Sequence, residues 1–174
     1  MDIYKEQLVT KKNTSKDLFK KFCVLFGTLV LILACIFVLP ISGQFYIFPL
    51  LVIAGVIYAL FSYYPLLNTE YEYIFTNGDL DVDKIMGKAK RKRLATFDVT
   101  FAEEFGRYTP GMFDSRSDEF NTRLIACTSP ADPDAHYLIM NNPTLQHCLL
   151  VFNPNDAMVE SIKEYLPRTA KVND

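Results

Sequence analysis

The chain has 174 residues and a formal net charge of −2, so it has room for one modest domain and a few accessory segments. Residues 1–21 carry six lysines against three acidic residues, residues 22–68 carry no charged side chain, and residues 69–174 carry 12 basic and 17 acidic residues. This division argues against an ordinary water-soluble domain. The acidic C-terminal part also argues against nucleic acid as a partner.

Residues 1–21 are predicted to be a basic cytoplasmic leader, followed by a transmembrane helical hairpin over residues 22–67. The charge-free run breaks at residues 40–44 (PISGQ), where Pro40 and Gly43 suit a tight connection. The two pieces, about 22–39 and 45–64, each have the length that crosses a hydrocarbon core of about 30 Å. Gly55 and Ala59 form a small-xxx-small face that suits close helix packing or oligomerisation.

Three alternatives compete with the hairpin. A buried soluble helical pair is disfavoured because neither helix has a polar face for water. A cleaved signal peptide is disfavoured by the long charged leader and by the lack of a small-x-small cleavage site. Lipidation at Cys35 is disfavoured because an apolar segment, rather than a polar mature start, follows it.

The distribution of basic residues predicts the orientation. Six lysines precede the first span, none lies in the connection, and six basic residues follow between Lys84 and Arg93. By the positive-inside rule, both termini are expected in the cytoplasm.

Residues 69–168 are predicted to form a strand-rich cytoplasmic domain, followed by a tail over residues 169–174. Residues 70–85 alternate apolar and charged side chains around Asn77-Gly78, which predicts a β-hairpin with Asp79, Asp81 and Asp83 pointing to water. Further strands are expected at residues 93–101, 103–108, 122–128, 136–142 and 146–152. The helical period of residues 152–167 predicts a closing amphipathic helix, capped by Asn153 with Pro154 at its first position.

Three stretches carry a family resemblance. EYEYIFTNGDLDVDKI (70–85) is similar to the opening strands of bacterial membrane-anchored pleckstrin-homology-like (PH-like) domains, RKRLATFDV (91–99) resembles their third strand, and LLVFNPNDAMVESIKEYLP (149–167) resembles their last strand and capping helix. The whole chain resembles a bacterial family of two-span proteins with this domain. The resemblance implies a membrane-anchored α+β protein of the bacterial inner membrane. Its transmembrane hairpin would precede a PH-like β-barrel of six or seven strands capped by a C-terminal helix.

Two surfaces are candidates for binding. A basic cluster close to the membrane exit would attract anionic headgroups with about 1 kcal/mol per charge; its members are Lys84, Lys88, Lys90, Arg91, Lys92 and Arg93. The alternative is a solvated edge strand whose lysines discourage sheet-to-sheet pairing. The second candidate is a loop more apolar than a loop requires, a partner surface made by Phe105, Tyr108, Met112 and Phe113.

No catalytic residue, metal site or cofactor is predicted. Cys127, His136, His147 and Cys148 lack the paired spacing of zinc ligands, and no His or Lys is placed beside Glu103 and Glu104 by the sequence. The sequence therefore favours a non-catalytic membrane-anchored module that presents its PH-like domain to a protein partner or a second copy and touches anionic lipid. The alternative is an accessory subunit or enzyme that acts on lipids or cell-envelope substrates.

Overall fold

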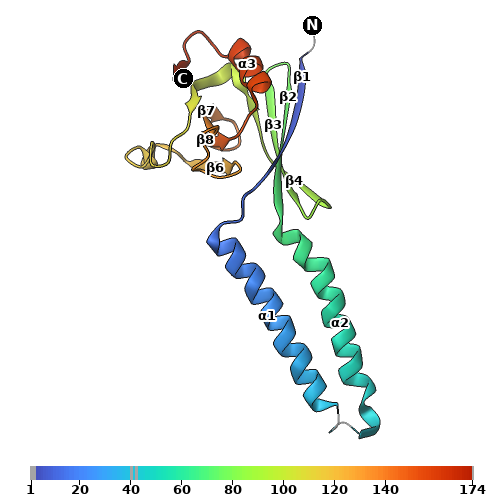
Figure 1. Ribbon diagram of the computed structural model, residues 1–174. Helices are drawn as coiled ribbons and strands as arrows, with labels where there is room; N and C mark the ends of the chain where they lie inside the picture. Colours follow the sequence, from blue (N-terminus) through green and yellow to red (C-terminus); the bar gives the residue numbers. More distant parts are fainter. Residues whose placement is uncertain (1–2, 40, 42, 174) are drawn as a thin grey trace. The chain divides into compact units, whose positions relative to one another are not determined.

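The computed structural model describes residues 3–39, 41 and 43–173 (Figure 1). These residues fall into two compact units. Unit 1 contains residues 3–12, 69–85 and 91–173, and unit 2 contains residues 13–68 and 86–90 with the gaps given above. The predicted turn residue Pro40 lies outside the described residues.

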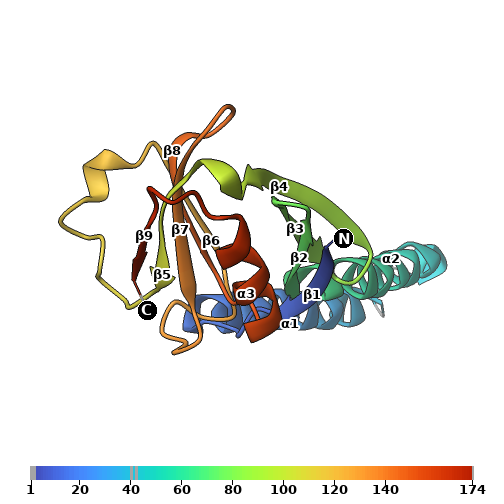
Figure 2. The same ribbon diagram turned by 90° about the horizontal axis from the view of Figure 1, so that it is seen from above.

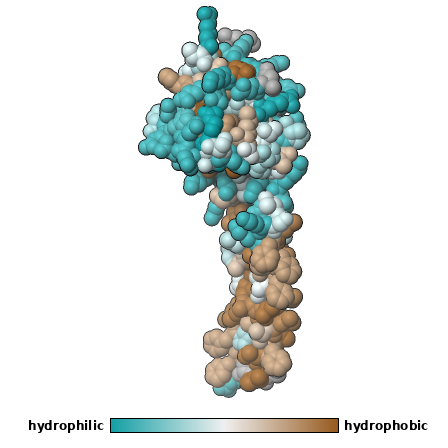
Figure 3. All heavy atoms as spheres, turned by 90° about the vertical axis from the view of Figure 1, so that its left-hand side faces the viewer, coloured by the Kyte–Doolittle hydropathy of each residue, from teal (hydrophilic) through white to brown (hydrophobic). Residues whose placement is uncertain are grey.

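Unit 2 is a helical hairpin made of α1 (Ser15–Val38), the short turn η1 (Gly43–Phe45), α2 (Ile47–Tyr63) and the short turn η2 (Tyr64–Leu67). α1 begins before the expected start at Phe22, because Asp17 Oδ2 accepts a hydrogen bond from the backbone N–H of Thr14 and caps the lysine-bearing first turns. No described side chain of α1 or α2 is buried. Both helices are long and apolar enough to cross a membrane, and apolar side chains cover most of the hairpin face shown in Figure 3.

Ala59 and Gly55 have different surroundings in the hairpin. Ala59 lines a groove of about 370 Å³ between the helices, together with Gly27 and Thr28 of α1. A Cβ added at Gly55 would meet no atom within 4 Å, so this glycine is not needed for a close approach of α1. The helix-packing role of the pair stays a prediction.

Unit 1 contains two sheets and one helix. The first sheet has the order β1-β2-β3-β4 and the second the order β6-β8-β7-β5-β9. The strands are β1 (Tyr4–Thr10), β2 (Thr69–Thr76), β3 (Asp79–Met86), β4 (Lys90–Asp98), β5 (Ala102–Arg107), β6 (Thr122–Ala126), β7 (His136–Asn142), β8 (Gln146–Phe152) and β9 (Lys171–Asn173); the helix is α3 (Asp156–Tyr165).

The basic leader is not a separate segment in the structure. Its residues Tyr4–Thr10 form β1, which pairs antiparallel with β2 from Tyr4↔Thr76 to Thr10↔Glu70. The hairpin is therefore inserted between the first two strands of one sheet, and the expected boundary at residue 21 does not separate leader from domain. Likewise, three residues of the expected tail form β9.

The expected barrel is not closed. Seven of the described strands lie within residues 69–168, but hydrogen bonding does not continue from one sheet to the other. The chain changes sheet at Val99–Phe101, a 3₁₀ turn whose entry is capped by Asp98 Oδ1, 3.0 Å from the Thr100 nitrogen. This turn interrupts the strand and lets β4 and β5 belong to different sheets.

Side chains from both sheets and from α3 form the main core. Tyr73, Phe75 and Leu80 of the first sheet, Leu138 and Leu150 of the second and Met158 and Ile162 of the helix are all buried there. Figure 2 shows α3 between the two sheets. The helix cap differs from the prediction: Asn155, rather than Asn153, accepts from the Met158 nitrogen at 2.9 Å. Asn153 instead accepts from the Thr128 nitrogen.

The second sheet is buried on both faces. Its other face carries Tyr137, Ile139, Leu149 and Val151, and residues 108–121 cover it through Phe113 and Phe120. The phenylalanine Phe113 packs edge-on against Tyr137 with ring centroids 4.8 Å apart. Ile125 of the outer strand β6 is still 50% exposed, so the cover does not extend fully over that strand.

Candidate functional site

The two arginines of the predicted basic cluster pair with carboxylates of the first sheet, while their own side chains stay 55% and 50% exposed. Arg91 contacts Glu72 Oε2 at 2.6 Å, and Arg93 Nε contacts Asp83 Oδ1 at 2.6 Å. Arg93 also reaches Asp81 at 2.8 Å, and Arg91 lies 4.0 Å from Asp83. The hydrogen bond to Asp83, more than the other neighbours, raises the pKa of Arg93.

This network corrects the expectation that three aspartates of the hairpin point to water. The side chain of Asp83 is only 3% exposed and that of Glu72 only 6%. Both carboxylates need a positive partner, because a buried unpaired charge is costly. Arg91 and Arg93 are therefore committed to these carboxylates. Lys88, Lys90 and Lys92 keep exposed side chains, and Lys84 is half-buried.

Two of those lysines belong to the hairpin unit. The turn of residues 86–90 joins β3 to β4 and packs on η2, where the Gly87 nitrogen donates to the Asn68 carbonyl at 2.9 Å. Gly87 has φ +60°, and a Cβ there would lie 2.9 Å from the carbonyl carbon of Pro65, so the close approach requires glycine. Unit 2 thus gathers a group of lysines, here called the lysine collar: Lys16, Lys20, Lys21, Lys88 and Lys90.

The predicted partner loop is largely part of the core. Phe105 is fully buried and Phe113 is 4% exposed, whereas Tyr108 is half-buried, and burial raises its pKa. Met112, at 39% exposure, is the member that stays accessible. Packing explains the apolar character of this segment: Phe105 belongs to β5 and to the main core, whereas Phe113 and Tyr108 cover the other face of the second sheet. The role of these four residues in binding stays a prediction, and less of their surface is accessible to a partner than the sequence suggested.

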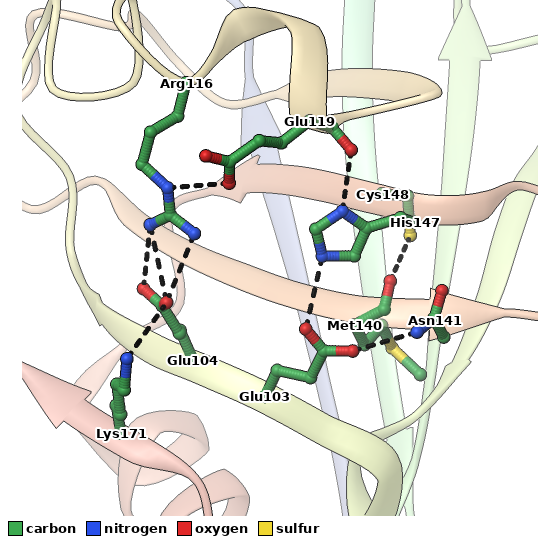
Figure 4. Close-up of polar contacts among 9 residues, drawn as sticks. All are labelled: Glu103, Glu104, Arg116, Glu119, Met140, Asn141, His147, Cys148 and Lys171. Atoms are coloured by element: carbon green, nitrogen blue, oxygen red, sulfur yellow. Dashed lines mark hydrogen bonds and ion pairs between the residues drawn. The ribbon is translucent and has the colours of Figure 1, made fainter.

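A charged network holds the covering loop against β5 (Figure 4). Arg116 donates to Glu119 at 2.8 Å and reaches Glu104 on β5 at 3.4 Å. The bond to Glu119, and then the one to Glu104, raises the pKa of Arg116. The same guanidinium lies over the Phe113 ring, 5.7 Å from its centroid. Arg116 thus ties the loop to the sheet by charge and by packing.

Glu103 and Glu104 each gain a cationic or basic neighbour that the sequence did not reveal. His147 on β8 lies with Nε2 3.2 Å from Glu103 Oε2 and Nδ1 2.8 Å from the Glu119 carbonyl oxygen. Lys171 on β9 lies 4.0 Å from Glu104 (Figure 4). These partners are 44 or more residues away along the chain, and no spacing motif connects them.

A polar pocket of about 420 Å³ forms a second candidate site in unit 1. Its lining includes Gln7 of β1, Arg107, Asp132, Asp134 and His136. His136 Nδ1 lies 3.0 Å from the Asp134 carbonyl, the ring stacks on Phe105, and burial lowers the pKa of the imidazole. The imidazole of His136, the guanidinium of Arg107 and the nearby aspartates could together bind a small polar molecule.

The cysteines and carboxylates do not assemble a metal centre in the part of the chain that the structure describes, where no group of three or more His, Cys, Asp or Glu is placed to hold an ion. Cys127 and Cys148 lie in different core clusters. Burial raises the pKa of both thiols to about 11, which is the behaviour of packed rather than reactive cysteines.

The order of elements defines a PH-like α+β fold with two apolar N-terminal helices. The chain belongs to the family described as bacterial PH-like domain (DUF6106), whose model matches residues 1–172. The resemblance predicted from the sequence is thereby confirmed. No curated protein and no solved structure matches the chain. PH-like domains are generally non-catalytic interaction modules, and the fold alone names no ligand.

Proposed function

We propose that this chain is a non-catalytic interaction module held in the bacterial inner membrane. Its hairpin crosses the bilayer twice, both termini and the PH-like domain lie in the cytoplasm, and the domain binds a protein partner. The lysine collar contacts anionic headgroups. The observation that carries the proposal is the pairing of β1 with β2, which joins the chain before the hairpin to the chain after it.

This pairing supports an even number of crossings. Strands that exchange main-chain hydrogen bonds lie on the same side of a membrane, so the segment between them has to return to the side where it started. The exposed apolar surface of α1 and α2 supports insertion, since no described residue of either helix is buried by the protein itself. The lysines at the chain ends of the hairpin then favour the cytoplasm as that side.

The lysine collar supports a contact with anionic lipid. Lys88 and Lys90 are exposed and belong to the same unit as the helices. Arg91 and Arg93, by contrast, form ion pairs with the buried carboxylates of Glu72 and Asp83. Each lysine near an anionic surface contributes about 1 kcal/mol. The arrangement favours a contact with several headgroups, which would orient the domain. It does not favour a pocket that binds a single inositol phosphate.

Lipid binding by the full chain tests the proposal. The delipidated protein in detergent is titrated with phosphatidylglycerol or phosphatidylcholine, and bound lipids are counted by native mass spectrometry. We expect preference for phosphatidylglycerol, weakened at least about tenfold in Lys88→Glu/Lys90→Glu. The matched control, Lys5→Glu/Arg168→Glu, makes the same charge change in unit 1 and should bind like the parent. Equal binding by all three proteins would refute the lipid contact.

The alternative, an accessory subunit or enzyme acting on lipids or cell-envelope substrates, rests on the polar pocket around His136. A small molecule that copurifies from membranes with the parent chain, and is lost from Arg107→Ala, would favour this alternative.

A further inference from the structure

The C-terminal strand covers β5 with little help from its own side chains. β9 pairs in parallel with β5 at Glu104↔Lys171, Phe105↔Val172 and Gly106↔Asn173, and all three of its side chains are exposed. Val172 keeps 46% of its surface. The strand is held mainly by main-chain hydrogen bonds, which any extended segment can offer.

The β5 side of this pairing is shaped for the approach of a backbone. A Cβ at Gly106 would lie 2.1 Å from the Asn173 carbonyl oxygen, and its three nearest neighbours would all be atoms of Asn173. A larger residue at position 106 would therefore clash with β9, and β9 alone supplies the three nearest atoms. Asn173 Nδ2 also donates to the buried Tyr137 hydroxyl at 2.6 Å, which supplies one side-chain anchor.

The surface continues beyond the part that β9 covers. β5 spans Ala102–Arg107, but β9 pairs with three of its residues. A groove of about 500 Å³ lies at the start of β5. It is lined by Phe101, Glu103 and Glu104, by Pro167 and Thr169 of the segment that leads into β9, and by Lys171 of β9 itself. Phe101 is 67% exposed, a large apolar side chain that β9 leaves open to water. A longer segment than β9 would cover it.

The charge of the groove indicates what such a segment carries. Glu103 and Glu104 face it, and the tail meets them with Lys171, whose ammonium lies 4.0 Å from Glu104 Oε1. The side chain of Glu104 is 14% exposed and also pairs with Arg116, whereas the Lys171 side chain is 76% exposed, so the groove accepts a cation from its open side without burying it. A ligand that replaces the tail would keep a lysine or arginine opposite Glu104.

We infer that the edge of β5 is a docking site for an extended, lysine- or arginine-bearing segment of a protein partner, which the chain's own C-terminal strand occupies until the partner displaces it. This inference rests on the proposed interaction role and names its partner class. Such binding is addition of a strand to an exposed sheet edge, where main-chain bonds give affinity and the flanking pockets give specificity.

A peptide probe tests the inference without lipid and without an unidentified partner, so its outcome is separate from that of the lipid titration. The probe is a fluorescent peptide with the sequence of residues 167–174, PRTAKVND. It is titrated in detergent against the intact full chain and against a chain that ends at Arg168, with fluorescence anisotropy as the readout. The truncated chain should bind the peptide at least about tenfold more tightly, because in the intact chain the tethered tail competes at an effective concentration on the order of millimolar.

Substitutions in the truncated chain identify the edge as the binding surface. Gly106→Val should abolish peptide binding, while Gly55→Ala, a glycine change in open space, should leave it unchanged. A peptide with glutamate in place of its lysine should bind at least several-fold more weakly. In the intact chain, Gly106→Ala should speed hydrogen exchange at residues 171–173, because its Cβ displaces Asn173 and not the core.

Two results would overturn the inference. The first is a truncated chain that melts like the parent and does not bind the peptide, since the edge is then free yet inert. The second is a truncated chain that loses its fold, since β9 is then an integral strand and not a placeholder. Melting curves of every variant accompany the titrations and separate these cases.

Discussion

Removing β1 should destabilise the PH-like domain, although β1 lies on the far side of the hairpin in the sequence. Two soluble proteins separate the effect of the strand from that of the hairpin. One contains residues 69–174 alone. In the other, residues 13–68 are replaced by a short Gly-Ser linker that joins Lys12 to Thr69. The join is short because the Lys11 nitrogen already donates to the Thr69 carbonyl at 3.0 Å.

The contacts of β1 set the size of the effect. Val9 is 8% exposed, and burying a valine side chain stabilises by about 1.5 kcal/mol. Gln7 uses both ends of its amide, donating to the Asn153 carbonyl at 2.9 Å and accepting from the Asn155 nitrogen at 2.7 Å, and each bond contributes about 1 kcal/mol. The ladder bonds to β2 roughly offset the entropy of ordering the strand. The protein without β1 should therefore be less stable by about 3 kcal/mol.

Thermal and urea unfolding of the two soluble proteins measure this difference. A loss of about 3 kcal/mol corresponds to a melting temperature lower by roughly 10–20 °C for a domain of this size. The exposed edge of β2 should also make the shorter protein aggregate. In the linked protein, Gln7→Ala should cost about 2 kcal/mol, and the neighbouring exposed Lys5→Ala should stay within about 0.5 kcal/mol. Equal stability of the two soluble proteins would refute the structural role of β1.

Three further changes follow from the buried polar groups. Arg93→Ala should destabilise the linked protein by about 2 kcal/mol in urea, because Asp83 keeps only Arg91 at 4.0 Å, whereas the exposed Lys92→Ala should be nearly neutral. Burial lowers the pKa of His136, so the unfolded chain binds the proton more readily, and stability should fall as the pH drops below about 6.5; His136→Gln should lose this part of the slope between pH 7.5 and pH 5.5. Burial raises the pKa of Cys127 and Cys148 to about 11, so iodoacetamide at pH 8 should label them only after unfolding, as peptide mapping would show.

The local strands could be predicted because their signals are contained within a few residues. Asn77 and Gly78 have φ values of 49° and 103°, as a hairpin turn between alternating strands requires. Local patterns of apolar and polar residues also indicate the opening strands of residues 70–85, the paired strands β7 and β8, and the closing helix α3. Strand β1 was missed because it lies within residues 1–21, whose six lysines resemble a charged leader, and because its partner β2 follows only after the whole hairpin.

The candidate sites were harder to predict because they depend on which distant side chains meet. The sequence showed a dense basic run, but only the fold shows that Glu72 and Asp83 neutralise its arginines. It showed apolar residues in a loop, but not that the second sheet has a face for Phe113 to cover. The side chains around Glu104 come from β5, β9 and the covering loop, and no pattern within any one of these segments indicates the others.

The edges of the two sheets differ in how they avoid pairing with other chains. β4 begins with four consecutive cationic residues and β1 carries exposed Lys5 and Glu6, which are common guards of an open edge. A very short strand such as β9 is also a guard, and protection alone would explain its presence on β5. Charge and proline also lie beside the uncovered end of β5, where Glu103, Glu104, Pro167 and Lys171 line the groove. Protection accounts for these residues, but it does not require Phe101, a phenylalanine that is 67% exposed beside them. Three features fit an edge at which a longer strand can replace β9: the short strand β9 itself, Gly106, which allows a backbone to approach, and the exposed ring of Phe101.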